Sequence, residues 1–324
     1  MTDTAPSLGD LFEFYLAQKR PFDDATRSQA RKLNSTGIPV ARASSLGNCL
    51  LAQWLEGKGA PTRPNDDPDT LRTFDNGSTI ADRVVQAISD LGLLAFGPTV
   101  HGGETYLHDD DINLAGHVDC IMQWPPVEVD EMAGTVVELN FLEAMRAKLA
   151  EEFPGVPDGY TVLDELKTTN PFSFKYSEKD DAEAKEGHII QAGSYIEMAR
   201  LHPDQMPRGR TFDEARVSYW SYGGNLGKIP LSSVSFTLDM DVAAKAARQR
   251  AITLRDAWAN DTVPNCECKS EGKLAWTTEF CSLSDIYAVD DEAGTVTFQC
   301  CVGSTYQRRI KSKEVLRSPW KVKP

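Results

Sequence analysis

Three residues on two predicted strands have the types and spacing of a metal-dependent hydrolytic site. Asp119 lies in a predicted strand over residues 112–123, and Glu165 and Lys167 lie in a second over residues 160–169. Because side chains alternate along a strand, the two-residue spacing directs Glu165 and Lys167 to the same side of the sheet. Two carboxylates from adjacent strands make a hard oxygen site for Mg²⁺ or Mn²⁺, and a neighbouring lysine can polarise a metal-bound water or stabilise charge on a phosphate. The combination predicts phosphodiester cleavage.

The Glu-x-Lys pattern alone identifies no site, because it occurs five times in this chain. Of these pairs, only Glu165/Lys167 lies within a strong strand pattern that also follows an acid-bearing strand. The alternative is that this glutamate and lysine are ordinary charges on the solvated face of an edge strand. The five pairs are Glu56/Lys58, Glu165/Lys167, Glu183/Lys185, Glu267/Lys269 and Glu271/Lys273.

The elements around this pair predict an α/β fold with a central mixed β-sheet flanked by helices. The helix before the first strand is expected to begin at Asn76 or Ser78, either of which can cap it, and to end at Gly92. A helix over residues 137–153 separates the two acid-bearing strands and forms an insertion at about 125–158. The other expected elements are helices over 8–16, from about Ser45 through Cys49, over 189–201 and over 241–260, and strands over 214–222, 229–238 and 296–302.

Composition and charge narrow the class of protein. The chain has 324 residues, of which 34 are Lys or Arg and 48 are Asp or Glu, giving a net charge of −14. This balance argues against nucleic-acid binding through overall charge, so any such contact must be local. No apolar run approaches the roughly 20 residues of a membrane span. The first ten residues lack a basic stretch followed by an apolar one, so we expect no secretory signal, no membrane partner and a cytoplasmic location.

The order of the motifs resembles the PD-(D/E)XK nuclease superfamily, in particular its RecB-like exonuclease branch. In that branch a Gly-x-x-Asp strand, a Glu-x-Lys strand and a Gln-x-x-x-Tyr helix follow one another, as 116–119, 165–167 and 191–195 do here. The segment 42–49, with Trp54 after it, is similar to the N-terminal cysteine segment of members that hold an iron–sulfur cluster, such as the CRISPR-associated and AddAB-type relatives. The resemblance covers about residues 42 to 290.

The resemblance implies a metal-dependent deoxyribonuclease with a restriction-endonuclease-like core, an exonuclease that acts on DNA ends or single-stranded DNA. Carried over by position, Asp119 and Glu165 bind Mg²⁺ or Mn²⁺, and the backbone carbonyl of Leu166 adds a ligand. The same resemblance implies that Lys167 is the catalytic lysine. Protein partners cannot be inferred from the motifs.

Two helical residues, Gln191 and Tyr195, would orient the catalytic lysine or contact DNA, with simple helix packing as the alternative. One position departs from the RecB-like pattern. Many members have a histidine four residues after a glycine in the helix before the first strand, whereas here Gly77 is followed at that place by Ala81. The third side-chain ligand is therefore unassigned, and a degenerate nuclease that only binds nucleic acid is one alternative. A restriction-type endonuclease is another.

Seven cysteines in a chain without a secretory signal call for metal binding or packing. Cys266, Cys268 and Cys281 lie within 16 residues of one another and, with distant Cys49, could supply four soft ligands. In the iron–sulfur nucleases one N-terminal and three C-terminal cysteines bind a 4Fe–4S cluster, and the resemblance implies the same here. Zinc and unliganded reduced cysteines are the alternatives. Cys120 is expected in the core.

We expect three regions in the chain. They are an N-terminal helical arm over 1–41, a nuclease core over 42–263, and a C-terminal iron–sulfur segment with a basic tail over 264–324. From residue 306 to the end there are seven basic residues against Glu314 alone, so this segment could contact several phosphates. Solvated surface charge is the alternative.

Overall fold

The computed structural model describes most of the chain between residues 37 and 267 and a strand-forming part beyond it. Contacts group the chain into two compact units. We call residues 41–47 and 76–252 the sheet unit, and residues 1–40, 48–75 and 253–324 the cysteine unit. The described residues are 37–60, 68–101, 104–124, 147, 151, 155–157, 159–169, 171–179, 182–221, 233–267, 285–290, 293, 295–299 and 305–309.

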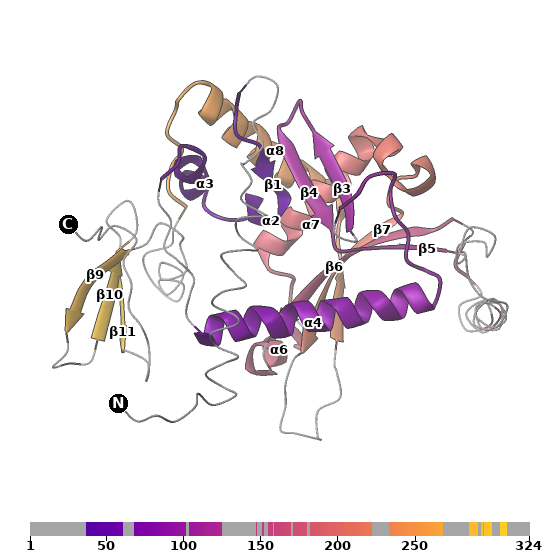
Figure 1. Ribbon diagram of the computed structural model, residues 1–324, viewed down its shortest axis with the longest axis horizontal. Coiled ribbons are helices and arrows are strands. Elements are labelled where there is room, and N and C mark those ends of the chain that lie inside the picture. The colour runs from indigo at the N-terminus through magenta and orange to yellow at the C-terminus, as the bar shows by residue number, and fades with distance from the viewer. Residues whose placement is uncertain are drawn as a thin grey trace, which may run out of the picture. The chain divides into compact units, whose positions relative to one another are not determined.

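The sheet unit contains a four-stranded mixed sheet that carries the predicted Glu-x-Lys strand (Figure 1). Its order is β5-β6-β7-β8, in which β6 and β7 run parallel and the two outer pairs run antiparallel. Parallel pairing of β6 with β7 requires a crossover, which the chain makes through helices. The strands are β5 (Cys120–Gln123), β6 (Thr161–Thr169), β7 (Glu214–Ser221) and β8 (Ser233–Thr237).

A second mixed sheet in this unit has the order β1-β4-β3-β2. Its strand β4 continues into β5 of the first sheet, with a bend at Asp119 between them. The single strand expected over 112–123 is therefore two strands in two sheets, because the chain changes sheet at Asp119. The strands of the second sheet are β1 (Ala41–Arg42), β2 (Val100–His101), β3 (Glu104–Asp109) and β4 (Leu114–Val118).

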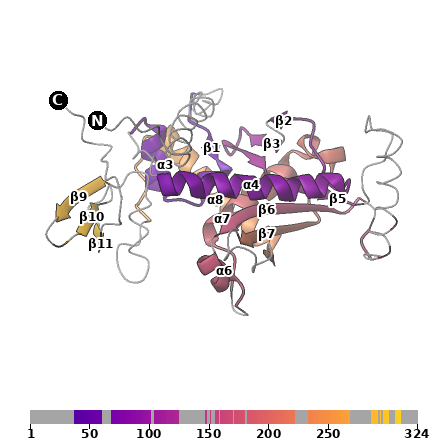
Figure 2. The ribbon, with the colours of Figure 1, turned by 60° about the horizontal axis from the view of Figure 1, so that its bottom comes forward.

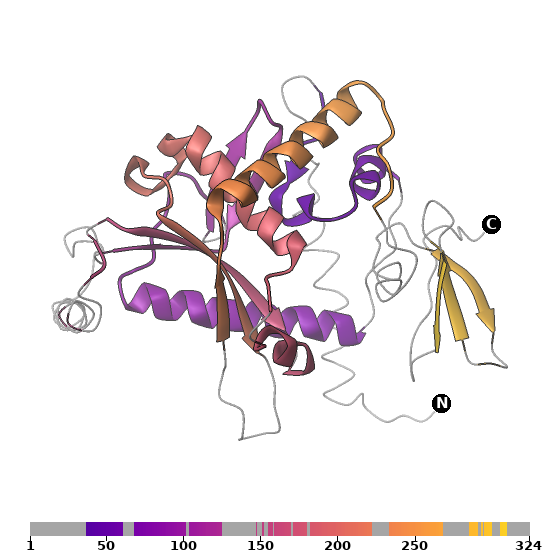
Figure 3. The ribbon, with the colours of Figure 1, turned by 180° about the vertical axis from the view of Figure 1, so that it is seen from behind.

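Helices cover both faces of the β5–β8 sheet. The part of α4 that belongs to the sheet unit lies on one face, where Gly77 approaches the side chain of Thr168, and α7 lies on the other (Figures 1 and 3). The predicted α/β class, with mixed sheets flanked by helices, is confirmed. The helices of the unit are α2 (Ala43–Leu46), α4 (Pro68–Asp90), α6 (Pro171–Ser177), α7 (Glu186–Leu201) and α8 (Met240–Ala259), with short 3₁₀ turns at Pro203–Gln205 and Pro207–Gly209.

Helix α4 begins earlier than the sequence pattern suggested. Figure 2 shows it as one uninterrupted helix, and it starts at Pro68, so the expected capping residues Asn76 and Ser78 lie in its interior. Proline is favoured at the first helical position, because it has no N–H to leave unpaired there and its φ angle already suits a helix. The expectation of a helix start at Asn76 or Ser78 was wrong.

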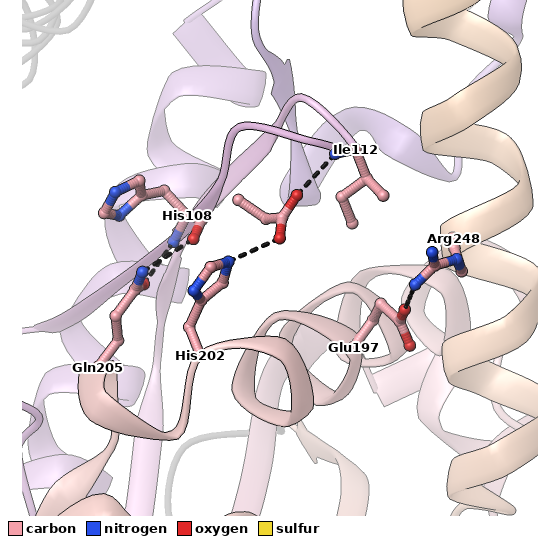
Figure 4. A network of polar contacts seen from close by, with 7 residues as sticks. His108, Ile112, Glu197, His202, Gln205 and Arg248 are labelled. Atoms are coloured by element: carbon pink, nitrogen blue, oxygen red, sulfur yellow. Dashed lines mark hydrogen bonds and ion pairs between the residues drawn. The ribbon is translucent and has the colours of Figure 1, made fainter.

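Helix α7 is buried on every side rather than along one stripe. Every residue from 190 to 199 is buried, which places this helix in the centre of the unit. Small residues allow the close approach this requires: a Cβ added at Gly193 would lie 2.2 Å from the backbone oxygen of Ala243 in α8. An ion pair between Glu197 and Arg248 joins the same two helices, as Figure 4 shows.

Polar contacts fix the turn after β3 to the C-terminal end of α7 (Figure 4). Asp109 accepts a hydrogen bond from the backbone N–H of Ile112 at 2.6 Å, and its other oxygen lies 2.6 Å from Nε2 of His202. The Gln205 amide accepts from the backbone N–H of His108 at 2.8 Å and donates to its carbonyl at 3.0 Å. These contacts hold the β3–β4 hairpin against α7, which sets the position of Asp119 at the end of β4.

The cysteine unit combines helix α3 (Leu50–Gly57) with a three-stranded antiparallel sheet of order β11-β10-β9. Two tryptophans join α3 to the end of α8: Trp54 Nε1 donates to the carbonyl of Ala257, and Trp258 Nε1 donates to the carbonyl of Trp54, both at 3.2 Å. Strand β11 falls within the basic tail, where no strand was expected. The strands are β9 (Asp285–Asp290), β10 (Thr295–Gln299) and β11 (Thr305–Arg309).

Some expected elements cannot be compared with the structure. The helix over 8–16 and, apart from positions 147 and 151, the insertion helix over 137–153 lie outside the described residues. The boundaries at 41 and 263 stay predictions. Among the residues that are described, no helix has the length and apolar character needed to cross a membrane.

The α7–α8 crossing gives the first prediction. Replacing glycine by alanine inside a helix ordinarily stabilises it by about 1 kcal/mol. At Gly193 the added methyl group would meet the α8 backbone, so we expect Gly193→Ala to destabilise the protein by about 1–3 kcal/mol. Urea unfolding measures the difference. In Gly155→Ala the added methyl meets no heavy atom within 4 Å, so this control should unfold like the wild type. Stabilisation by Gly193→Ala would contradict the close crossing.

Candidate functional site

Glu165 and Lys167 lie side by side on β6, as their spacing predicts. Glu165 has 0% of its side chain exposed, whereas 22% of the Lys167 side chain is exposed. The Lys167 ammonium forms an ion pair with Oε1 of Glu165. These residues do not lie on a solvated sheet face, so the alternative of ordinary surface charges is wrong for this pair.

Asp119 joins this pair through the backbone of the same strand. Its Oδ2 accepts a hydrogen bond from the N–H of Leu166 at 3.2 Å. The bend between β4 and β5 places its partly buried side chain there. Asp119 and Glu165 are also close enough that each carboxylate affects the pKa of the other. The three residues predicted to share a site are therefore together.

The charges of this cluster are strongly perturbed. Burial, reinforced by the negative charge of Asp119, raises the pKa of Glu165 well above its usual range, while Lys167 acts in the opposite direction. Burial also raises the pKa of Asp119, which Lys167 partly offsets. Burial alone would lower the pKa of Lys167, but the Glu165 and Asp119 carboxylates outweigh it and raise that pKa. Two acids thus share one counter-charge.

The carboxylate pair fits a divalent cation. Both oxygens of Glu165 are buried, and beyond the charged contacts with Lys167 and Asp119 they have no hydrogen-bond partner within the described residues. Mg²⁺ usually binds one or two carboxylates and keeps several waters, so Asp119, Glu165 and a backbone carbonyl are a sufficient protein contribution. No group of three or more His, Cys, Asp or Glu that could hold a metal occurs in the described part of the chain.

The helical pair Gln191 and Tyr195 lies beside the acids. Gln191 Nε2 donates to the Tyr195 hydroxyl at 3.3 Å, and burial, followed by the charges of Glu165 and Asp119, raises the tyrosine pKa well above its usual range. Only 1% of Tyr195 is exposed, which leaves almost no surface for DNA. A Cβ at Gly116 would lie 2.7 Å from the Tyr195 ring, so the glycine of the Gly-x-x-Asp pattern is needed for close packing of β4 on α7.

Sequence reasoning missed two residues of this site. Tyr219 of β7 lies directly opposite Lys167 in the parallel register, and its hydroxyl is 2.8 Å from Nδ1 of His188 on α7. Burial, followed by the charges of Lys167 and Lys185, lowers the His188 pKa to about 3, so the imidazole is neutral. His188 lies one helical turn before Gln191, which was a usable signal. The place of Tyr219 depends on strand pairing, which the sequence alone did not reveal.

The helix before the first strand has no histidine at the position of the missing ligand. Ala81, at the position of the missing histidine, is partly exposed, and its neighbour Asp82 is exposed. Gly77 of the same helix approaches Thr168, which alternates onto the face of β6 opposite Glu165 and Lys167. The third side-chain ligand stays unassigned.

Two of the four predicted iron–sulfur cysteines lie together in the cysteine unit. Cys49, at the N-terminal end of α3, has its sulfur 3.9 Å from that of Cys266, 217 positions away in sequence. This separation exceeds the disulfide bond length of about 2.05 Å. The N–H of Glu267 donates to Cys49 Sγ at 3.4 Å. Cys268 and Cys281 lie outside the described residues.

Cys120 is a core residue, as expected. It is buried, and burial together with the charges of Asp164 and Asp119 raises its pKa to about 12, so it is a neutral thiol. It takes no part in the cysteine pair of the other unit.

Comparison of the chain with protein-family models and with curated proteins gives no match.

A neighbouring acid on the other face of β6 provides a contrast. Burial raises the pKa of Asp164 to about 6, while the Ser218 hydroxyl and Arg216 act in the opposite direction. Asp164 points away from Glu165, since successive side chains of a strand alternate. It is therefore a matched control for the cluster.

The Asp164 carboxyl gives the second prediction. The folded protein holds this proton more tightly than the unfolded chain does, so stability is lost as the pH rises from about 4 to about 6. Asp164→Asn removes the ionisation, and we expect the variant to be more stable than wild type by about 2–3 kcal/mol at about pH 7.5 and equal to it near pH 4. Urea unfolding with a metal chelator present measures this. Lower stability of the variant at neutral pH would show that Ser218 and Arg216 hold the charged form.

Proposed function

We propose that this protein is a Mg²⁺- or Mn²⁺-dependent deoxyribonuclease, an exonuclease of the RecB-like PD-(D/E)XK type that acts on DNA ends or single strands. The observation that carries the proposal is the cluster of Asp119, Glu165 and Lys167 at the junction of two sheets, in which the fully buried Glu165 carboxylate forms an ion pair with the lysine. Strongly perturbed pKa values cluster at functional sites, so a buried charge cluster of this kind is a candidate site.

The order of elements supports the same proposal. From α4 the chain runs through β2, β3, β4, β5 and β6, and then through α6, α7 and two short 3₁₀ turns to β7. The last of these strands pairs in parallel with β6. A restriction-endonuclease-like core is the fold we infer from this order together with the acid-bearing strands.

Each residue then has a separate task. Asp119, Glu165 and the carbonyl of Leu166 would hold the metal ion. When bound, the ion supplies a water of lowered pKa and positive charge for the phosphate. The ammonium of Lys167, partly exposed and held by Glu165, can stabilise negative charge that develops on the phosphate. Gln191 and Tyr195 support the acids by packing and are not placed to contact DNA.

The cysteine pair supports a second metal system. We propose that Cys49 and Cys266, with Cys268 and Cys281, hold a 4Fe–4S cluster, with zinc as the alternative. The contact of two cysteines across 217 positions supports this, as does the N–H of Glu267, which donates to a sulfur as peptide groups do around thiolate ligands.

A nucleic-acid-binding module with a degenerate site is the second candidate. The observation in its favour is Ala81, which cannot ligate a metal where a histidine would. The presence of both acids and the lysine argues for the nuclease, because a module that only binds DNA does not need a buried acidic pair, which lowers stability.

The cluster gives the third prediction. We expect Asp119→Asn, Glu165→Gln and Lys167→Ala each to lower the cleavage rate by about 100-fold or more. The first two remove a negatively charged ligand of the metal ion, and the third removes the ammonium that stabilises negative charge on the phosphate. The assay follows end-labelled single- and double-stranded DNA with Mn²⁺, Mg²⁺ or chelator. Circular single-stranded DNA distinguishes an exonuclease from an endonuclease.

Asp164→Asn is the matched control, since it removes the adjacent acid on the other face of the same strand, and it should cleave like the wild type. Wild-type rates in Glu165→Gln would overturn the assignment of the site. Tight DNA binding by the wild type without any cleavage would favour the degenerate module.

The cysteine pair gives the fourth prediction. Anaerobically purified protein should be brown and contain about four irons per chain, whereas a zinc site would leave it colourless. Cys49→Ser should lose most of the iron and unfold more readily, because metal binding is coupled to folding. Metal analysis with thermal unfolding checks both. Cys120→Ala is the control that keeps its iron. Full iron content in Cys49→Ser would contradict the pairing with Cys266.

A further inference from the structure

Tyr219 lies between the backbone of Lys185 and the imidazole ring of His188. The backbone N–H of Lys185 donates to the Tyr219 hydroxyl oxygen at 2.9 Å. The hydroxyl has one hydrogen, and the nearest acceptor for it is Nδ1 of His188, at 2.8 Å. With the hydroxyl as the donor, Nδ1 is the acceptor and therefore unprotonated, and the neutral His188 ring then carries its hydrogen on Nε2.

The Nε2–H group of His188 is left available to a ligand. Among the described residues, the only hydrogen-bond partner of this ring is Tyr219, through Nδ1. The side chain is partly exposed, and Nε2 is not among the buried polar atoms that lack a partner. The ring thus presents one fixed, neutral donor that the protein itself does not use.

This donor lies at the catalytic end of β6. The Tyr219 position faces Lys167 in the parallel register, and His188 is near enough to Lys167 for that ammonium to oppose protonation of the imidazole. His188 also belongs to the first turn of the 16-residue helix α7, where backbone N–H groups favour anions. Each of these features suits a negatively charged oxygen.

We propose that His188 is a substrate-binding residue whose Nε2–H donates to a non-bridging phosphate oxygen of DNA at the Asp119–Glu165–Lys167 cluster, and that Tyr219 is a positioning residue that fixes its tautomer. This inference rests on the proposed nuclease function. A neutral donor suits this place, because it binds a phosphate through a charge-assisted hydrogen bond without adding a third positive charge beside Lys167 and Lys185. No proton is transferred by His188.

Three variants separate this role from a structural one. In His188→Asn the side-chain oxygen can replace Nδ1 and accept from Tyr219, but nothing remains at the Nε2 position. In His188→Gln the longer amide can return a donor to that position. Tyr219→Phe removes the hydroxyl that fixes the tautomer while retaining the ring that packs edge-on against Phe236. Thermal unfolding of each variant establishes that it is folded.

The first measurement is the affinity for a single-stranded oligonucleotide with Ca²⁺ in place of Mg²⁺, so that binding is read without turnover. We expect His188→Asn to bind about 10-fold more weakly, the size of one lost hydrogen bond to a charged group, and His188→Gln to recover most of the loss. A single methylphosphonate at the bound phosphate should weaken the wild type more than it weakens His188→Asn, since only the wild type donates to the replaced oxygen.

The second measurement is the tautomer, which needs no DNA. The chain has five histidines, so ¹⁵N-histidine NMR compared with His188→Asn identifies the His188 signals. We expect a protonated Nε2 and an unprotonated Nδ1 in the wild type, and a mixture of tautomers in Tyr219→Phe. A protonated Nδ1 in the wild type would overturn the proposal.

The outcomes distinguish this proposal from the proposed function. Wild-type affinity in a folded His188→Asn protein, when the wild type cleaves DNA, would overturn the role of His188 and leave the nuclease intact. A wild-type protein that neither binds nor cleaves DNA would overturn both. Weaker binding by His188→Asn with recovery in His188→Gln supports the donor role, because a packing defect would not be repaired by a longer, differently shaped side chain.

Discussion

Burial of two carboxylates beside a single ammonium group is the constraint on which the sheet unit depends. Glu165 has no exposed surface, Asp119 adds a second negative charge, and Lys167 supplies the one counter-charge. Replacing buried ionic groups with apolar ones is often neutral or stabilising, so a fold selected for stability alone would not need this cluster. The cluster at the sheet junction therefore concentrates charge at a cost in folding stability.

Uncharged groups around the cluster hold Asp119 and Glu165 in place. The N–H of Leu166 holds Asp119, and the absence of a side chain at Gly116 lets β4 approach the Tyr195 ring. Helix α7, buried on all sides and packed against α8 at Gly193, forms the rigid support behind the acids. Protonation of the cluster or binding of a cation therefore changes charge with little change in the supporting framework.

The periodicity of apolar and polar residues was enough to predict β6 and α7. The alternation of β6 correctly placed Glu165 and Lys167 on one side, and the long helix after it was also expected. The split at Asp119 was missed, because it follows from strand pairing: β4 pairs with β1 and β3, whereas β5 pairs with β6 in the other sheet. Tyr219 was missed for the same kind of reason, since only the parallel pairing of β6 with β7 puts it beside the lysine. The start of α4 was misplaced because Asn76 and Ser78 are typical capping residues, whereas the helix begins at Pro68, and proline is also favoured at a helix start.

The contact between Cys49 and Cys266 has a consequence for synthesis of the chain on the ribosome. The sheet unit is nearly contained between the two cysteines, whereas the cysteine unit needs residues from both sides of it. Nascent chains emerge from the N-terminal end, and units of structure form once their residues are available. The sheet unit can therefore fold before Cys266 has been synthesised, and the cysteine unit is completed last. A chain terminated before residue 266 would lack this closure while containing every residue of the acidic cluster.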